Sequence, residues 1–391
     1  MAEFSDWIAL FLRWFHVIAG IAWIGSSFYF VWLDNSLEEP PEWKKQKGIK
    51  GDLWSIHGGG FYEIAKYKVG PEKMPENLHW FKWEAYTTFI TGSLLLIWLY
   101  YLQASAYMVD PEVMELTAGA AVGLSLLFIF SGWAIYEVLC NTPLVRNGLV
   151  FLSILLVIGT VYAWLFTHFF SGRAAYIQMG AMIGMVMAVN VMLRIIPGQK
   201  KMVAQVAAGE AVDPQPGLIG KQRSVHNNYF TLPLIFMMIS NHYPMTYQHE
   251  YNWLVLMAIV VITIWTRHYF NLKHQGRSKP VILVTAALAF AVLAFLVSYQ
   301  PATASTSTEN VSFSHVQQII NDRCTACHSR KPTDELFPVA PLGMMFNDQK
   351  DIERHWDRIV ARATVSKDMP FNNRTHMTEE ERKILAQWQP E

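Results

Sequence analysis

Eight long apolar stretches fill the first 300 residues of this 391-residue chain and constrain its fold more than any other feature. A helix needs about 20 apolar residues to cross the hydrocarbon layer of a membrane. The sixth stretch is short, and we expect its helix to extend into the polar residues that flank it. The sequence therefore predicts an all-α, polytopic bundle of eight transmembrane helices over residues 1–300, with spans at 7–33, 81–102, 113–139, 144–169, 174–196, 227–241, 251–270 and 281–299.

A pentapeptide near the C-terminus, Cys324-Thr325-Ala326-Cys327-His328, predicts a different kind of domain. C-x-x-C-H is the attachment sequence of a c-type haem: two cysteines form thioethers to the haem and the histidine binds the iron. A redox-active or zinc-binding C-x-x-C that happens to precede histidine is the alternative. We expect Cys324, Cys327 and His328 to hold a covalent haem c.

Methionine is a frequent second axial ligand of haem c because it raises the reduction potential. Met344, Met345 and Met369 lie downstream of the motif. We favour Met369, because Pro370 fixes the adjacent backbone and the segment leads into a capping box at Thr378 that opens a terminal helix. The order of helix, C-x-x-C-H, Met-Pro and terminal helix resembles small class I cytochromes c. Residues 311–391 are therefore expected to form a cytochrome c-like domain after a flexible linker at 301–310.

Loop charges predict the orientation of the bundle. Lysines between Lys44 and Lys73, and further basic residues in the third, fifth and seventh loops, place these odd-numbered loops on the cytoplasmic side by the positive-inside rule. Both termini then lie outside, where haem c is attached in bacteria. We expect a multi-pass protein of the bacterial inner membrane with a periplasmic cytochrome domain. The formal net charge of zero indicates no nucleic-acid partner.

Polar residues inside the predicted spans gather in the cytoplasmic halves. Such residues are costly in a membrane and mark functional sites by default, although some lie at helix ends or extend to the headgroups. The glycines that follow His57 would let the backbone approach a ligand closely. We expect one inward-facing polar chamber that contains His57 and the side chains of Glu84, Glu137, Asn190, Arg194, His226, Asn227, Asn228 and Arg267.

Three histidines belong to the opposite, outer half. His16 lies on one helical face with Gly20, and a glycine one turn from a histidine leaves room for a flat macrocycle. His168 and His242 end the fourth and sixth spans. A haem b held by two histidines would need two of these three residues, and the interior of a helix bundle is where such sites are built. A hydrogen-bonded structural histidine is the alternative for each.

Four segments carry a resemblance to a known family: Trp14–Gly25, His57–Tyr62, His226–Pro233 and Ser240–Pro244. Together with the fused haem domain, they resemble the membrane-bound bacterial urate oxidases, also called urate hydroxylases. The first span is also similar, more weakly, to the first helix of membrane haem-b proteins. The urate oxidase resemblance implies oxidation of urate to 5-hydroxyisourate, with electrons leaving through haem c to a soluble cytochrome c or a terminal cytochrome oxidase.

Chemistry suggests roles for the chamber residues. Urate is a planar anion whose edges carry amide and carbonyl groups. Hydrogen bonds and a positive charge suited to these edges are offered by Asn190, Asn227, Asn228 and Arg267. A general base is required, for which His57, His226, Glu84 and Glu137 are the candidates.

The position of the chamber leaves one difficulty. About 30 Å of hydrocarbon separates it from an external haem c, so either haem b bridges the gap or the site opens outside. The alternative function is an electron-relay cytochrome subunit of a respiratory oxidase or quinol dehydrogenase.

Overall fold

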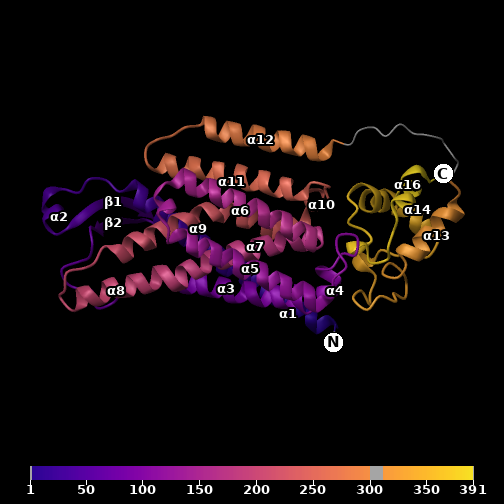
Figure 1. Ribbon diagram of the computed structural model, residues 1–391, viewed down its shortest axis with the longest axis horizontal. Coiled ribbons are helices and arrows are strands. Elements are labelled where there is room, and N and C mark those ends of the chain that lie inside the picture. The colour runs from indigo at the N-terminus through magenta and orange to yellow at the C-terminus, as the bar shows by residue number, and fades with distance from the viewer. Residues whose placement is uncertain (1, 300–310, 391) are drawn as a thin grey trace.

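The computed structural model describes residues 2–299 and 311–390. The predicted linker, residues 301–310, lies outside the described residues. Figure 1 shows a bundle of long helices with a small helical unit, residues 311–390, at one end. A β-hairpin lies at the other end of the bundle. We call these the docked end and the hairpin end.

Long helices form the bundle. Six of the helices in the described part of the chain are long and apolar enough to cross a membrane, which fits a membrane protein. The other two long elements, α3 and α9, do not meet this criterion, so the eight spans remain a prediction. The long elements are α1 (Ala2–Ser36), α3 (Trp83–Leu96, continued by a π-helical turn, Ile97–Tyr101), α5 (Ala118–Cys140), α6 (Gly148–Phe169), α7 (Gly172–Val189, joined through the π-helical Asn190–Ile195 to α8, Ile196–Ala207), α9 (Gln215–Ile239), α11 (Asn252–His274) and α12 (Val281–Ser298).

Short elements connect the long helices. They are α2 (Glu42–Gln46), α4 (Ala104–Tyr107) and α10 (Pro244–Tyr247), with 3-10 turns at Pro143–Arg146 and Ser240–His242. The expectation that the sixth span extends into its polar flanks is confirmed, because α9 begins well before His226 and the 3-10 turn after it reaches His242.

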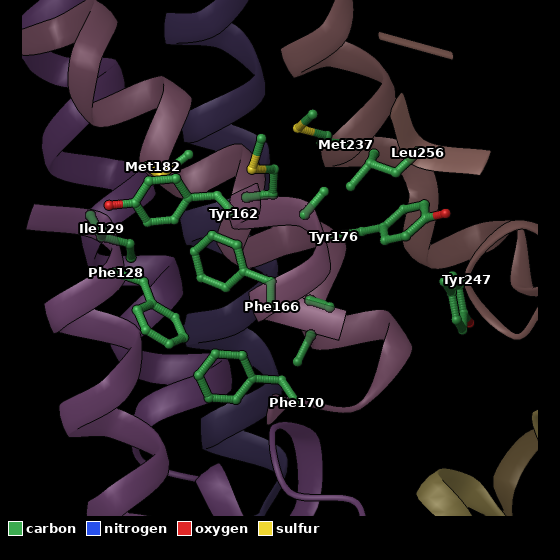
Figure 2. Close-up of a cluster of buried hydrophobic side chains, with 14 of the residues drawn as sticks. Phe128, Ile129, Tyr162, Phe166, Phe170, Tyr176, Met182, Met237, Tyr247 and Leu256 are labelled. Atoms are coloured by element: carbon green, nitrogen blue, oxygen red, sulfur yellow. The ribbon is translucent and has the colours of Figure 1, made fainter. Parts of the chain in front are cut away.

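Aromatic rings from α5 and α6 form the centre of the bundle core, as Figure 2 shows. Phe128 packs edge-to-face against Phe166, with ring centroids 5.5 Å apart. Small residues let the helices approach one another, as is usual between membrane helices. A side chain at Gly132, for example, would overlap the sulfur of Met182 on α7.

A two-stranded antiparallel sheet corrects the all-α prediction. Strand β1 (Ile49–His57) pairs with β2 (Gly60–Tyr67), and His57 lies opposite Gly60. Gly58 and Gly59, with φ of +58° and +82°, form the two-residue turn, and two positive φ values are what a hairpin turn of this type requires. The glycines therefore serve the turn, and the interpretation of this segment as a ligand-binding loop is not needed to explain them.

The C-terminal unit has its own hydrophobic core. Its helices are α13 (Phe313–Arg323), α14 (Gln349–Arg354), α15 (Trp356–Val360) and α16 (Glu379–Gln387), with a π-helical turn at Ala361–Val365 and 3-10 turns at Pro341–Gly343 and Phe371–Asn373. Val316, Ile320 and Leu385 are fully buried between them. The predicted capping box is confirmed: Thr378 and Glu381 satisfy each other's backbone N–H groups at the start of α16.

The segment after Met369 joins the two parts of the chain. The ring of Phe371 packs edge-to-face on Tyr107 of α4, with centroids 5.1 Å apart. The Asn372 side chain donates a hydrogen bond to the carbonyl oxygen of Ala106 at 2.5 Å, and Asn373 donates one to Glu112. Asn372 and Asn373 are buried. These contacts fix the C-terminal unit on the docked end of the bundle.

The start of α7 offers a test of packing at the docked end. An alanine Cβ at Gly172 would clash with the backbone carbonyl oxygen of Tyr247, and overpacking of this kind costs about 1–3 kcal/mol. We expect Gly172→Ala to lower the free energy of unfolding in detergent by that amount. Gly119, in the first turn of α5, has no atom near its hypothetical Cβ, so Gly119→Ala should not destabilise the protein. Equal stability of the two variants would contradict the close packing.

Candidate functional site

The C-x-x-C-H motif forms a compact turn after α13. The backbone N–H of His328 donates to the carbonyl oxygen of Cys324 at 2.8 Å. The His328 ring stacks on Phe346, and its Nδ1 lies 3.1 Å from the carbonyl oxygen of Met344. A hydrogen bond from Nδ1 to a carbonyl oxygen fixes the tautomer that leaves Nε2 free to bind a metal. This orientation fits the predicted role of His328 as a haem ligand.

The two thiols do not resemble a redox-active pair. Burial raises the pKa of Cys324 to about 12 and that of Cys327 to about 11, whereas the nucleophilic thiol of a redox C-x-x-C has a lowered pKa. In residues 2–299 and 311–390 no group of three histidine, cysteine or carboxylate side chains gathers as zinc would require. Haem attachment at this motif remains a prediction.

The neighbours of the methionines favour Met369 as the second ligand. The carbonyl oxygen of Met344 already contacts the ring of His328, so Met344 lies beside the predicted histidine ligand. Met369 is held from both sides of its backbone: its N–H donates to the carbonyl oxygen of Arg362 at 3.1 Å, and its own carbonyl oxygen accepts from the buried side chain of Arg382 at 2.8 Å. A segment held in this way can present a side chain in a fixed position.

Five of the predicted chamber residues meet in one hydrogen-bonded network near the hairpin end. Asn190 donates to Asn227 at 2.9 Å and to Tyr136 at 3.0 Å. The Tyr136 hydroxyl lies 2.9 Å from Nδ1 of His226. Glu137 completes the network by pairing with two arginines, Arg194 and Arg223. We call this set, Tyr136, Glu137, Asn190, Arg194, Arg223, His226 and Asn227, the inner network.

Most polar atoms of the inner network are satisfied by one another. Arg223 is almost fully buried, and its guanidinium lies 3.0 Å from Glu137 and over the ring of Tyr136. Asn227 also donates to the backbone carbonyl of Met187 at 3.0 Å. The network thus joins α5, α7 and α9, and a polar cluster in which most atoms are partnered holds helices together, although Nε of Arg223 is buried without a partner among the described residues.

A second cluster, on the other face of α9, is not satisfied. Asn228 accepts hydrogen bonds from Arg267 at 2.9 Å and from Asn271 at 3.0 Å. Arg267 also lies over the ring of Phe28, 3.8 Å from its centroid. Within residues 2–299 and 311–390, each of the three polar side chains keeps one buried atom without a partner: Nδ2 of Asn228, a terminal nitrogen of Arg267 and Oδ1 of Asn271. We call this cluster the inner node, and it could accept a small polar ligand or water.

The remaining predicted residues lie apart from these clusters. His57 ends strand β1 and is exposed at the tip of the hairpin. Glu84 lies in the first turn of α3, where one of its carboxylate oxygens is buried with no partner in the described part of the chain. Neither side chain has a hydrogen bond to the inner network or the inner node among the described residues. The chamber expected from the sequence is thus two separate clusters and two isolated side chains.

The three outer histidines have separate partners. Nδ1 of His16 lies 3.0 Å from the Thr91 hydroxyl, and its ring lies so close to Gly92 that a Cβ there would be 2.9 Å away. His168 is exposed and stacks on Trp164. His242 lies at the docked end. No contact among the described residues joins any two of them, so a haem b held by two of these histidines remains a prediction.

A polar cavity of about 210 Å³ lies where the C-terminal unit meets the bundle. Met369 and His242 both line it, from opposite sides of the junction. Arg173, in the first turn of α7, also lines it, with its guanidinium 5.7 Å from the ring of Tyr107 and 5.6 Å from that of Phe371. We call this space the junction cavity. It brings together one predicted haem c ligand and one predicted haem b ligand, which come from distant parts of the sequence.

Sequence reasoning missed several residues of these sites. Asn271 lies four residues after Arg267, and Arg223 lies four before Asn227, so each shares a helical face with a residue that was identified. That spacing could have revealed both. No spacing in the sequence identifies Arg173 or Tyr247, because they line the junction cavity only together with residues of the distant C-terminal unit.

The two arginines that share Glu137 provide a matched test of the inner network. The Arg223 side chain is 2% exposed, whereas that of Arg194 is 42% exposed. Removing one partner of a buried ion pair costs about 3–5 kcal/mol, while an exposed pair is worth about 1 kcal/mol at most. We expect Arg223→Met to be far less stable than Arg194→Met in equilibrium unfolding in detergent. Similar losses for both variants would show that the network does not hold the helices.

A family model described as "Urate oxidase N-terminal" matches residues 2–298, which include the whole bundle and its hairpin. The search of curated proteins and the search of solved structures found no match. The match ends before the C-x-x-C-H motif, and it covers well over half of the chain. The chain belongs to the urate oxidase N-terminal family.

Proposed function

We propose that this protein is a membrane-bound oxidoreductase that converts urate to 5-hydroxyisourate and passes the electrons to a haem c in its C-terminal unit. Membership of the urate oxidase family supports urate as substrate and oxidation as the reaction class. The single observation that carries the link to haem c is the C-x-x-C-H motif, with His328 oriented for an iron and the Met369 segment held against the bundle.

The overall reaction defines what the protein must do. Urate and one water molecule together release two protons and two electrons in forming 5-hydroxyisourate, and the oxygen of the water is the atom added to urate. Haem c, when bound, accepts one electron at a time, so two transfers complete each turnover and an external carrier removes the electrons. A soluble cytochrome c or a terminal cytochrome oxidase would serve as that carrier. The chain's own residues must bind the anion, hold the water and accept the protons.

The proposed location follows from the same features. Six long apolar helices among the described residues support an integral membrane protein. Basic residues between Lys44 and Lys73 surround the hairpin end, which favours the cytoplasmic side for that end. The docked end and the C-terminal unit then face the periplasm of a bacterial inner membrane. That is the compartment in which haem c would be attached and could reach an external carrier.

Urate should reduce the haem c of the isolated full chain. We expect the reduced haem spectrum to develop when urate is added to the purified, oxidised protein without any partner subunit. An electron-relay subunit would instead respond to a quinol and ignore urate. Reduction by quinol alone would contradict the proposal, and the spectrum reports this directly.

The second axial ligand can be tested by substitution. Methionine raises the reduction potential of a haem c, so Met369→Ala should lower the midpoint potential and abolish the sulfur-to-iron band at the red end of the oxidised spectrum. Met344→Ala is the matched control and should retain the band. The assignment is wrong if the band survives in Met369→Ala and disappears in Met344→Ala.

A further inference from the structure

We propose that the junction cavity, between α7, the α9–α11 connection and the segment around Met369, is the site where the planar urate anion binds for oxidation. This inference rests on the proposed function and names the place of its chemistry. It differs from the inward-facing chamber expected from the sequence. Figure 1 shows the C-terminal unit beside α4 and α10 at this end of the bundle.

The cavity is polar and has a suitable size. Its volume of about 210 Å³ is below the roughly 300–1,000 Å³ of pockets for drug-sized molecules. A small heterocycle such as a purine is the class of ligand that such a space suits. The cavity is built from both parts of the chain, because Arg173, Asn241 and Tyr247 come from the bundle and Arg362, Asp368 and Met369 from the C-terminal unit.

The charges that line the cavity favour an anion. Arg362 is already paired with Asp368 at 2.5 Å. Arg173 takes part in none of the ion pairs among the described residues, and its Nε is buried without a hydrogen-bond partner. When His242 is neutral, the positive charge of Arg173 therefore has no opposite charge to balance it among the residues that line the cavity. Arg173 also lies in the first turn of α7, an 18-residue helix whose N-terminus adds partial positive charge.

The neutral groups of the cavity suit the edges of a purine. Burial raises the pKa of Tyr247 to about 12, so its hydroxyl remains protonated and can donate to a carbonyl oxygen. The Oδ1 atom of Asn241 is buried without a partner among the described residues and could accept from a ring N–H. Urate carries both carbonyl oxygens and ring N–H groups. The cavity thus offers a cation, a donor and an acceptor to one planar molecule.

Distance along the helices favours this cavity over the inner clusters. Asn252, at the start of α11, donates to the Tyr247 carbonyl at 2.9 Å. Arg267 follows 15 residues later on the same helix, which places the inner node about 22 Å away at 1.5 Å per residue. Met369, by contrast, lines the junction cavity itself. A substrate bound there would lie next to the predicted haem ligand and would need no second cofactor.

Binding can be measured without turnover. The full holoprotein reduced with dithionite has no capacity to accept electrons, so equilibrium dialysis with labelled urate reports affinity alone. Loss of a hydrogen bond to a charged group costs about 1.5–3 kcal/mol, equivalent to a roughly 10- to 150-fold weaker Kd. We expect that loss for Arg173→Gln and a smaller one for Tyr247→Phe, which removes a single hydroxyl. Arg358→Gln, an exposed arginine on α15, is the matched control.

The outcomes separate the possibilities. Weaker urate binding in Arg173→Gln and Tyr247→Phe, with the haem spectrum intact, supports the junction cavity. If Arg267→Gln weakens binding and the two cavity variants do not, urate binds at the inner node and the inference is overturned. It is also overturned if the cavity variants shift the haem potential but bind urate normally, because a haem carboxylate then fills the cavity. Absence of urate binding and reduction in the unmodified protein would instead refute the proposed function.

Discussion

The proposed function depends first on the contact between the C-terminal unit and the bundle. Phe371 and the two buried asparagines that follow it pack on α4 immediately after Met369. A predicted haem ligand is thereby held against a polar cavity at the end of the helix bundle. A mobile tether alone would not give this fixed geometry, and electron transfer from a bound substrate requires the donor and acceptor to stay close together.

Polar groups at the other end of the bundle have a different role in this account. The inner network satisfies nearly all of its own hydrogen bonds, and it joins α5, α7 and α9 where these helices approach the hairpin. In a membrane, such a network replaces the hydrophobic driving force that would hold helices together in water. The inner node keeps three unpartnered atoms and remains able to hold water or a ligand. Along α11, Arg267 of the inner node lies 15 residues, or about 22 Å, from Asn252 at the docked end.

The sequence predicted the positions of the helices better than the contacts between them. Apolar length located the long helices, and the motif at Thr378 located the start of α16. The hairpin was missed because Gly58-Gly59 was interpreted as room for a ligand, although two glycines between runs of aromatic and aliphatic residues also predict a two-residue turn. Arg173 and Tyr247 could not be found. Both residues line the junction cavity together with Met369, which follows Arg173 by almost 200 positions and Tyr247 by about 120. Helical periodicity carries no information about contacts between segments so far apart in the sequence.

One measurement tests the central claim that urate oxidation is coupled to haem c without oxygen. Oxidised full-length protein is titrated with urate under anaerobic conditions and without an external carrier, while the haem spectrum is recorded. The account predicts that each urate reduces two haem c centres, since the reaction releases two electrons and each haem accepts one. A haem that stays oxidised until oxygen is admitted, with peroxide formed as urate disappears, would contradict it.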